Sequence, residues 1–205
     1  GDATTVGGVL NLGASVTSGM TTTYSVDPSS SATCTVDNHG NVAATNAGTC
    51  VITVTQSGNN KWKSTTSQRS VHVTQTSQTI SVTSQTPTSV VVGDTYTPSA
   101  TSTSKLAVAV SVSGSCTMSS GVITFNGVGT CTISYDQAGN NKYLAASTLT
   151  ETVSVGQLSQ VITVSAPSTV TVGDTLTLDA TSSAGASYPV AATLDATSTG
   201  CSLTS

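Results

Sequence analysis

The chain has 205 residues, a net charge of −4 and only 7% charged residues, and this composition excludes several functions. The five basic residues are scattered, so the chain has no basic stripe for nucleic acid and no polybasic segment for a membrane surface. No run reaches the ~20 apolar residues that a membrane helix needs, so we expect no direct membrane insertion. Because 41 Thr and 34 Ser replace helix formers such as Glu and Lys, the sequence predicts an all-β fold.

An internal repeat with a period of 80–82 residues organises the chain. The motifs Gly-Thr-Cys, Gly-Asn-Asn-Lys, Val-Gly-Asp-Thr and Ser-Gln-x-Ile each occur twice at this spacing. Such self-similarity is the signature of a tandem array of domains. The paired copies begin at Gly48 and Gly129, Gly58 and Gly139, Val92 and Val172, and Ser77 and Ser159.

The repeat divides the chain into three segments. Residues 1–75 form a first repeat that lacks its first strand, because Val6-Gly7-Gly8 takes the place of Val92-Gly93-Asp94 without the segment that should precede it. Residues 76–157 form a complete repeat, and residues 158–205 form the N-terminal half of a third. We therefore expect the chain to be a window into a longer array.

Within each repeat the sequence indicates short strands joined by Gly, Asn and Ser turns. Alternation of apolar and polar residues places Cys131, Ile133 and Tyr135 on the buried face of one strand. Six strands in a unit of about 80 residues are typical of a small antiparallel β-sandwich. In the complete repeat the predicted strands are residues 78–84, 95–101, 107–113, 122–126, 130–136 and 148–155.

The connections between repeats are short. Residues 73–77 join the first repeat to the second, and residues 155–159 join the second to the third. These segments have median loop length and little flexible Gly/Ser content. We therefore expect tandem β-sandwich domains in a rod-like array, in which the main partners of each repeat are the neighbouring repeats of the same chain.

The cysteines form two similarly spaced pairs and one single residue. Cys34 and Cys50 lie 16 positions apart, and Cys116 and Cys131 lie 15 apart at equivalent places in their repeats. We predict the disulfides Cys34–Cys50 and Cys116–Cys131, and a partner for Cys201 outside the chain. A zinc site is the weaker alternative, because no second ligand pair accompanies this spacing. Disulfides place the protein outside the reducing cytosol.

Several of these motifs resemble the immunoglobulin-like repeats of large bacterial surface and secreted proteins. The resemblance implies an Ig-like sandwich that serves as a spacer or adhesive segment of an adhesin-type stalk. The cysteine spacing departs from antibody domains, in which a disulfide joins more distant strands around a buried Trp. The residues that carry the resemblance are Gln78–Ile80, Val92–Tyr96, Gly129–Ile133 and Gln137–Tyr143.

The remaining polar motifs indicate structural roles, not catalytic or metal-binding ones. His39 lies in a turn and His72 at an outward strand position, so we predict no catalytic residue, no metal site and no cofactor. Asp94 recurs as Asp174 and is read as a turn former, with a calcium ligand as the weaker alternative. The Gly-Asn-Asn-Lys segments are read as hairpin turns after which Trp62 and Tyr143 pack back onto the sandwich.

The sequence therefore favours a non-catalytic structural segment of an extracellular bacterial surface protein or fibre. Two alternatives stay open. An open sheet edge in the first repeat would suit a filament subunit that polymerises with other copies by β-strand complementation. A glycan- or receptor-binding adhesin module is the third possibility, although no aromatic patch in the sequence marks a binding surface.

Overall fold

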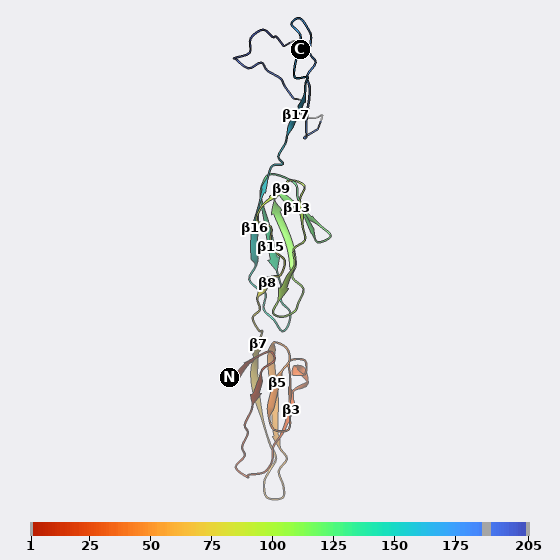
Figure 1. Cartoon of the computed structure of the whole chain (residues 1–205). Helices are drawn as coiled ribbons and strands as arrows, with labels where there is room; N and C mark the ends of the chain where they lie inside the picture. Colours follow the sequence, from red (N-terminus) through yellow and green to blue (C-terminus); the bar gives the residue numbers. More distant parts are fainter. Residues whose placement is uncertain (1, 186–189, 204–205) are drawn as a thin grey trace. The chain divides into compact units, whose positions relative to one another are not determined.

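The computed structural model describes residues 2–185 and 190–203 (Figure 1). The chain separates into two compact units, Gly1–Gly156 and Gln157–Ser205. Strands dominate both units, and the helical content of the described residues is the single-turn 3₁₀ helix η1 (Pro28–Ser30). The predicted all-β class is therefore confirmed.

One layer of the second repeat is built around a strand that is broken at Pro98. The two pieces of this strand are consecutive in the chain, and each pairs antiparallel with a different neighbour, so their partners belong to the same layer. Proline has no N–H to donate to a ladder, which explains the break. The layer consists of β8 (Ile80–Val82), β11 (Ala100–Ser102), β10 (Thr95–Tyr96), β14 (Val122–Phe125) and β13 (Cys116–Ser119).

The facing layer has four strands in the order β12-β15-β16-β9. Here β9 runs parallel to β16 and the other pairs are antiparallel. Side chains from both layers, including Phe125, Ile133 and Tyr135, are fully buried between them. This division of strands between two layers is that of an immunoglobulin-like sandwich. The bounds are β12 (Ala109–Gly114), β15 (Gly129–Asp136), β16 (Leu149–Gly156) and β9 (Val90–Val91).

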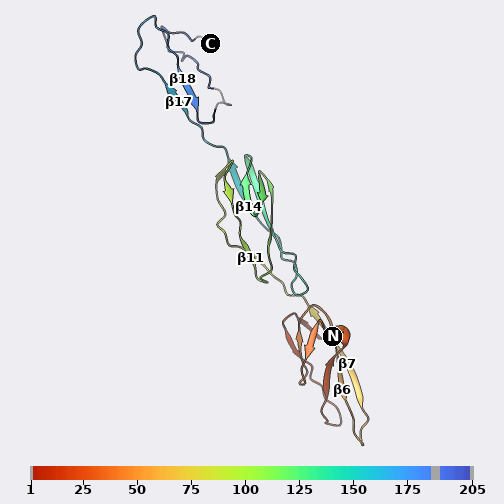
Figure 2. The same cartoon turned by 90° about the vertical axis from the view of Figure 1, so that its right-hand side faces the viewer.

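The first repeat has the same two layers but fewer strands. One layer is β2-β5-β4 and the other is β1-β7-β6-β3, with β1 parallel to β7 as β9 is to β16 (Figure 2). Val42, Ile52 and Val71 are fully buried between them. The bounds are β1 (Asp2–Thr5), β2 (Val9–Asn11), β3 (Thr23–Val26), β4 (Cys34–Val36), β5 (Asn41–Ala44), β6 (Gly48–Gln56) and β7 (Thr65–Thr74).

The described residues of the second unit form one strand pair. β17 (Ile162–Ser165) and β18 (Asp179–Ser182) are antiparallel, and they occupy the sequence positions of β8 and β11. None of its described residues is buried, and both Ile162 and Val164 are 57% exposed. This part of the third repeat therefore has no core of its own among the described residues.

The predicted strands of the complete repeat are mostly confirmed, with three corrections. The segment 95–101 is two strands, because Pro98 interrupts it. Cys116 begins a further strand, β13, which lies before the predicted fourth strand and was not predicted. The two-residue strand β9 was not predicted, because it is too short to show alternation. The inward alternation of Cys131, Ile133 and Tyr135 is confirmed, since all three are fully buried.

Candidate functional site

Each complete core is crossed by a disulfide between its two layers. Cys34 on β4 is bonded to Cys50 on β6, with 5.9 Å between their Cα atoms. Cys116 on β13 is bonded to Cys131 on β15, with 5.5 Å between theirs. All four side chains are buried. The two disulfides thus tie equivalent strands of opposite layers in the two repeats.

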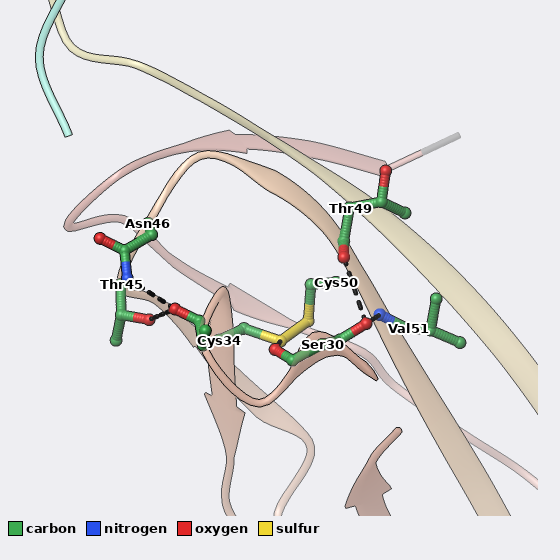
Figure 3. Close-up of a disulfide and its surroundings, with 8 residues drawn as sticks. Ser30, Cys34, Thr45, Asn46, Thr49, Cys50 and Val51 are labelled. Atoms are coloured by element: carbon green, nitrogen blue, oxygen red, sulfur yellow. Dashed lines mark hydrogen bonds between the residues drawn. A yellow bond between two sulfur atoms is a disulfide. The ribbon is translucent and has the colours of Figure 1, made fainter. Parts of the chain in front are cut away.

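A buried serine anchors the chain beside the first disulfide (Figure 3). The hydroxyl of Ser30 donates to the carbonyl of Thr49 (3.2 Å) and accepts from the N–H of Val51 (3.1 Å). These two residues flank Cys50, so η1 is fixed to β6 at the disulfide. Asp27 caps η1 by accepting from the N–H of Ser29, and the hydrogen bonds from Ser29 lower the pKa of Asp27.

The connection between the first two repeats is paired like a strand. The N–H of Thr76 donates to the carbonyl of Lys142 (2.9 Å), and the N–H of Leu144 donates to the carbonyl of Thr76 (2.9 Å). These bonds form a parallel bridge between Thr76 and Tyr143. The connecting segment is therefore held against the loop that follows β15.

Two further contacts reach the same loop from the first repeat. The side-chain amide of Gln75 donates to the carbonyls of Asn140 (2.5 Å) and Tyr143 (3.3 Å). The N–H of Ala47, in the turn before β6, donates to the carbonyl of Asn141 (3.1 Å). The loop thus accepts hydrogen bonds from both the connecting segment and the body of the first repeat.

At the end of the connecting segment, the buried side chain of Gln78 forms a network of hydrogen bonds. Its amide nitrogen donates to Oε1 of Gln137 (2.5 Å) and to the carbonyl of Leu144 (2.7 Å). Its Oε1 accepts from the hydroxyl of Ser104 (2.5 Å). The Gln78 side chain is only 6% exposed, so these bonds compensate for the water that it loses. The Gln of the Ser-Gln-x-Ile motif is therefore a structural residue.

The Gly-Asn-Asn-Lys motif shapes the loop that the connection meets. Oδ1 of Asn140 accepts from the N–H groups of Lys142 (2.8 Å) and Tyr143 (3.1 Å), which makes a tight Asx-type turn. Gly139 has φ +77°, and a Cβ there would overlap the carbonyl oxygen of Tyr143. Only glycine fits this position, and the turn directs backbone carbonyls toward the connecting segment.

The same motif forms the same turn in the first repeat. Oδ1 of Asn59 accepts from the N–H groups of Lys61 (2.8 Å) and Trp62 (2.9 Å), and Gly58 has φ +75°. The prediction that Trp62 packs back onto the sandwich is wrong: the residue is 43% exposed, with the Lys61 ammonium 5.8 Å from its ring. Tyr143 meets the connecting segment, a role that the sequence did not indicate.

Isolated polar residues lie where the sequence placed them. His39 and His72 are exposed, and Asp37 accepts from the N–H groups of His39 and Asn41. Hydrogen bonds, chiefly those from Asn41, lower the pKa of Asp37. The described residues contain no group of three or more His, Cys, Asp or Glu side chains arranged to hold a metal ion.

Asp94, Asp174 and Cys201 are the remaining residues that the sequence analysis singled out. Oδ2 of Asp94 accepts from the N–H of Val91 (2.9 Å), and Oδ2 of Asp174 accepts from that of Thr171 (3.2 Å). Both aspartates therefore close turns. Cys201 is exposed and takes part in no disulfide within residues 2–185 and 190–203.

The second repeat contains a polar pair, formed by the buried Tyr135 and the half-buried Glu151, that sequence patterns did not predict. The hydroxyl of Tyr135 donates to Oε2 of Glu151 (2.9 Å) across the β15–β16 ladder. Burial, followed by the hydrogen bond to Glu151, raises the pKa of Tyr135 above its usual value. The first repeat has Val54 and Arg69 at these positions, and Arg69 pairs instead with Asp2 (2.9 Å).

No protein-family model matches the chain, and no curated protein matches it. Similar solved structures include human protocadherin-24 EC1-2, at 13% identity over 77% of this chain and 94% of that one, with a TM-score of 0.30. Domains 4–9 of the surface layer protein SbsC match at 19% identity over 70% and 23%, with a TM-score of 0.32. The fibronectin(III)-like modules of Clostridium thermocellum CbhA match at 15% over 77% and 90%, with a TM-score of 0.32.

The sandwich assignment rests on the sheets and disulfides of the chain itself. Two layers with the strand division of an immunoglobulin domain occur twice within residues 2–156, so this part of the chain has an immunoglobulin-like β-sandwich fold. Within the described residues, no helix has the length and apolar character needed to cross a membrane.

Proposed function

We propose that this chain is a non-catalytic structural segment of an extracellular bacterial surface protein or fibre, in which disulfide-stapled repeats act as a spacer. One observation carries the proposal. Residues 75–78 do not form a free linker but are hydrogen-bonded through Gln75, Thr76 and Gln78 to the following repeat. A connection held in this way transmits position and force from one repeat to the next.

The recurring motifs support a structural role. In the Gly-Asn-Asn-Lys, Ser-Gln-x-Ile and Val-Gly-Asp-Thr motifs, the Asn, Gln and Asp side chains are used for loops, junctions and turns. The Gly-Thr-Cys motif supplies a disulfide cysteine in each repeat. The residues that recur from repeat to repeat are therefore those that stabilise each domain and connect it to the next.

The disulfides suit an extracellular segment under tension. Each bond closes a loop of 15 or 16 residues and spans the two layers of its sandwich. When a repeat is pulled open, the residues inside that loop cannot be extended. Disulfides persist in oxidising environments such as the cell surface, which agrees with an extracellular location.

Single-molecule pulling from the two ends of the chain tests this proposal. We expect the opening of each of the first two repeats to release about 50 Å less contour length in the oxidised chain than in the reduced chain, because extended residues span ~3.3–3.6 Å each. The paired variant Cys116→Ala/Cys131→Ala should lengthen one opening step only, and Cys201→Ala should change none. Equal steps with and without the disulfides would contradict the proposal.

A filament subunit that assembles by β-strand complementation is the second candidate function. It is favoured by one edge of the first repeat, where Ala14–Val16 pair with no strand among the described residues, while the equivalent β11 pairs with β8. Sedimentation of the purified chain tests this candidate, since chains that stay separate at high concentration would exclude it.

A further inference from the structure

In the second repeat, β12 has an open edge. It lies at the end of the layer β12-β15-β16-β9 and, among the described residues, pairs on one side only, with β15. The strand covers six residues, Ala109–Gly114, and includes no charged residue and no proline. An edge strand of this kind presents a row of unpaired N–H and C=O groups to which a further strand can add.

The hydrogen bonds of the β12–β15 ladder show which backbone groups face the open edge. The register continues past β12 to Ser115, whose N–H donates to the carbonyl of Thr130 (3.0 Å). In an antiparallel pair, the residues that exchange such bonds alternate with residues that do not. Counted back from Ser115, Ser111 therefore directs its backbone groups toward β15, whereas Val110 and Val112 direct theirs toward the open edge.

The side chains of β12 leave this edge accessible to a strand. Ala109, Ser111 and Ser113 are exposed, and all three are small and uncharged. Val110 and Val112 are half-buried and pack against the core of the repeat. An added strand therefore meets neither a charge nor a bulky side chain on β12, and its own apolar side chains lie beside the two valines.

The equivalent edge of the first repeat is blocked. The edge strand β3 ends at Val26 and is followed by Asp27 and Pro28, at the start of η1. By the alignment of the two ladders, these two residues stand where β12 continues as Ser113 and Gly114. A charged side chain and a proline, which has no N–H to donate, are devices that keep edge strands from pairing. β12 has neither of them.

We propose that β12 pairs antiparallel with β12 of a second copy of this chain, which joins two chains side by side through their second repeats. This lateral contact goes beyond the spacer role, and it does not involve the edge of the first repeat at Ala14–Val16. The four-stranded layers of the two copies become one continuous sheet. The interface is isologous, because the same strand supplies both sides of a two-fold axis.

The sequence of the strand argues for a second copy as the occupant. Residues 109–113 read Ala-Val-Ser-Val-Ser, which is nearly the same in both directions about Ser111. Two antiparallel copies therefore place Val110 of each opposite Val112 of the other, and the two Ser111 side chains opposite each other on the axis. The valines are the residues whose backbone groups face the edge, so they form the hydrogen-bonded pairs. No pair contains a charge, whereas like charges directly opposite each other would weaken the contact.

The geometry of Gly114 selects this register. Because backbone groups alternate between the two sides of a strand, the two copies can shift past each other only in steps of two residues. A shift toward the end of β12 would pair Val110 with Gly114, whose φ of +88° is not that of an extended strand. A shift the other way would pair Val112 with Val108, which precedes the strand. The register centred on Ser111 keeps every backbone pair within extended residues.

Sedimentation equilibrium of the intact chain tests the proposal, with Cys201→Ala as background so that the exposed Cys201 thiol links no chains. We expect a concentration-dependent dimer, and Ser111→Lys should raise its dissociation constant at least tenfold, because two ammonium groups then meet at the axis. Thr150→Lys is the matched control and should leave the dimer unchanged. Thr150 is exposed in the same cross-strand row as Ser111 and Ser134, but two strands away from the edge. Purely monomeric chains, or equal effects of the two variants, would overturn the proposal.

Cross-linking in the same background reads the register. Ser111→Cys should form a disulfide between two chains when glutathione disulfide oxidises the two thiols and is reduced to two glutathione molecules. Opposed residues of a non-hydrogen-bonded pair have Cα atoms about 4.5 Å apart, within the reach of a disulfide. Ala109→Cys is the control, because its two copies lie four residues apart along the paired strands, about 13–14 Å. Preferential linking of the Ser111→Cys chain is expected, and equal yields would overturn the register. Either failure leaves the junction and disulfides of the spacer proposal untouched.

Discussion

The side-chain amide of Gln78 donates to Oε1 of Gln137 at 2.5 Å, although 59 residues separate the two in the chain. Gln78 begins the second repeat and Gln137 follows β15, so this bond joins the entry of the repeat to the loop that receives the connecting segment. Oε1 of Gln137 also accepts from the N–H of Gly139 (2.6 Å), which couples the bond to the loop itself.

Replacement of Gln78 should therefore destabilise the second repeat. Gln78→Ala removes three hydrogen bonds of a buried side chain, to Gln137, Leu144 and Ser104, which costs about 1–3 kcal/mol of unfolding free energy. Urea denaturation followed by far-UV circular dichroism measures this loss. Gln85→Ala, at an exposed glutamine, is the matched control and should stay within about 0.5 kcal/mol of the parent. Equal effects of the two variants would show that the network contributes nothing.

A comparison of alanine substitutions at Gly139 and Gly121 tests the close packing of Gly139 against the carbonyl of Tyr143. Gly139 and Gly121 have nearly the same φ, +77° and +80°, so alanine at either position pays a similar backbone strain of about 1–2 kcal/mol. A Cβ at Gly121 meets open space, whereas one at Gly139 overlaps the carbonyl of Tyr143. Gly139→Ala should therefore lower the thermal midpoint more than Gly121→Ala. The opposite order would contradict the loop geometry.

Removal of one disulfide should weaken its own repeat. In the chain-entropy estimate, a closed loop of 15 residues contributes about 3 kcal/mol, so Cys116→Ala/Cys131→Ala should lower the unfolding free energy by about that amount. Hydrogen exchange resolved by residue measures the loss in β15 and β16. Cys201→Ala should change nothing, and the first repeat should keep its protection. A uniform loss across both repeats would contradict separate disulfide-stapled cores.

The Tyr135–Glu151 pair should make the second repeat less stable at alkaline pH. Because the pKa of Tyr135 is raised above its unfolded value of about 10, the folded chain favours the neutral phenol, and stability falls as the pH rises above that value. Tyr135→Phe loses a hydrogen bond worth about 1 kcal/mol at neutral pH but has no phenol to titrate. Its deficit relative to the parent should shrink between pH 9 and 11 in urea denaturation. A constant deficit would contradict this role.

The sequence predicted the elements whose signal is local. Alternation placed Cys131, Ile133 and Tyr135 in the core, and the structure has all three fully buried. Turn chemistry identified Asp94, whose carboxylate closes the turn before β10. The all-β class followed from composition, because Thr and Val favour strands wherever they alternate.

The partners of polar residues could not be predicted, because they depend on contacts between distant segments. Nothing in the neighbourhood of Gln78 indicates that its amide meets Gln137 and Leu144. Trp62 and Tyr143 were assigned to the sandwich for their apolar character, whereas Trp62 is 43% exposed and Tyr143 is bridged to Thr76. The repeated Gly-Asn-Asn-Lys motif was the available signal. It indicated that this loop matters, but not which segment the loop contacts.

Hydrogen exchange at the connection tests the central claim most directly. The N–H of Thr76 is bonded to the carbonyl of Lys142, whereas the N–H of Ser77 donates no hydrogen bond within the described chain. An ordered junction predicts that the Thr76 amide exchanges slowly, at a rate approaching that of the β15 and β16 amides, beside a fast-exchanging Ser77. Exchange of Thr76 at the rate of an unstructured peptide would show that the repeats are joined by a free linker.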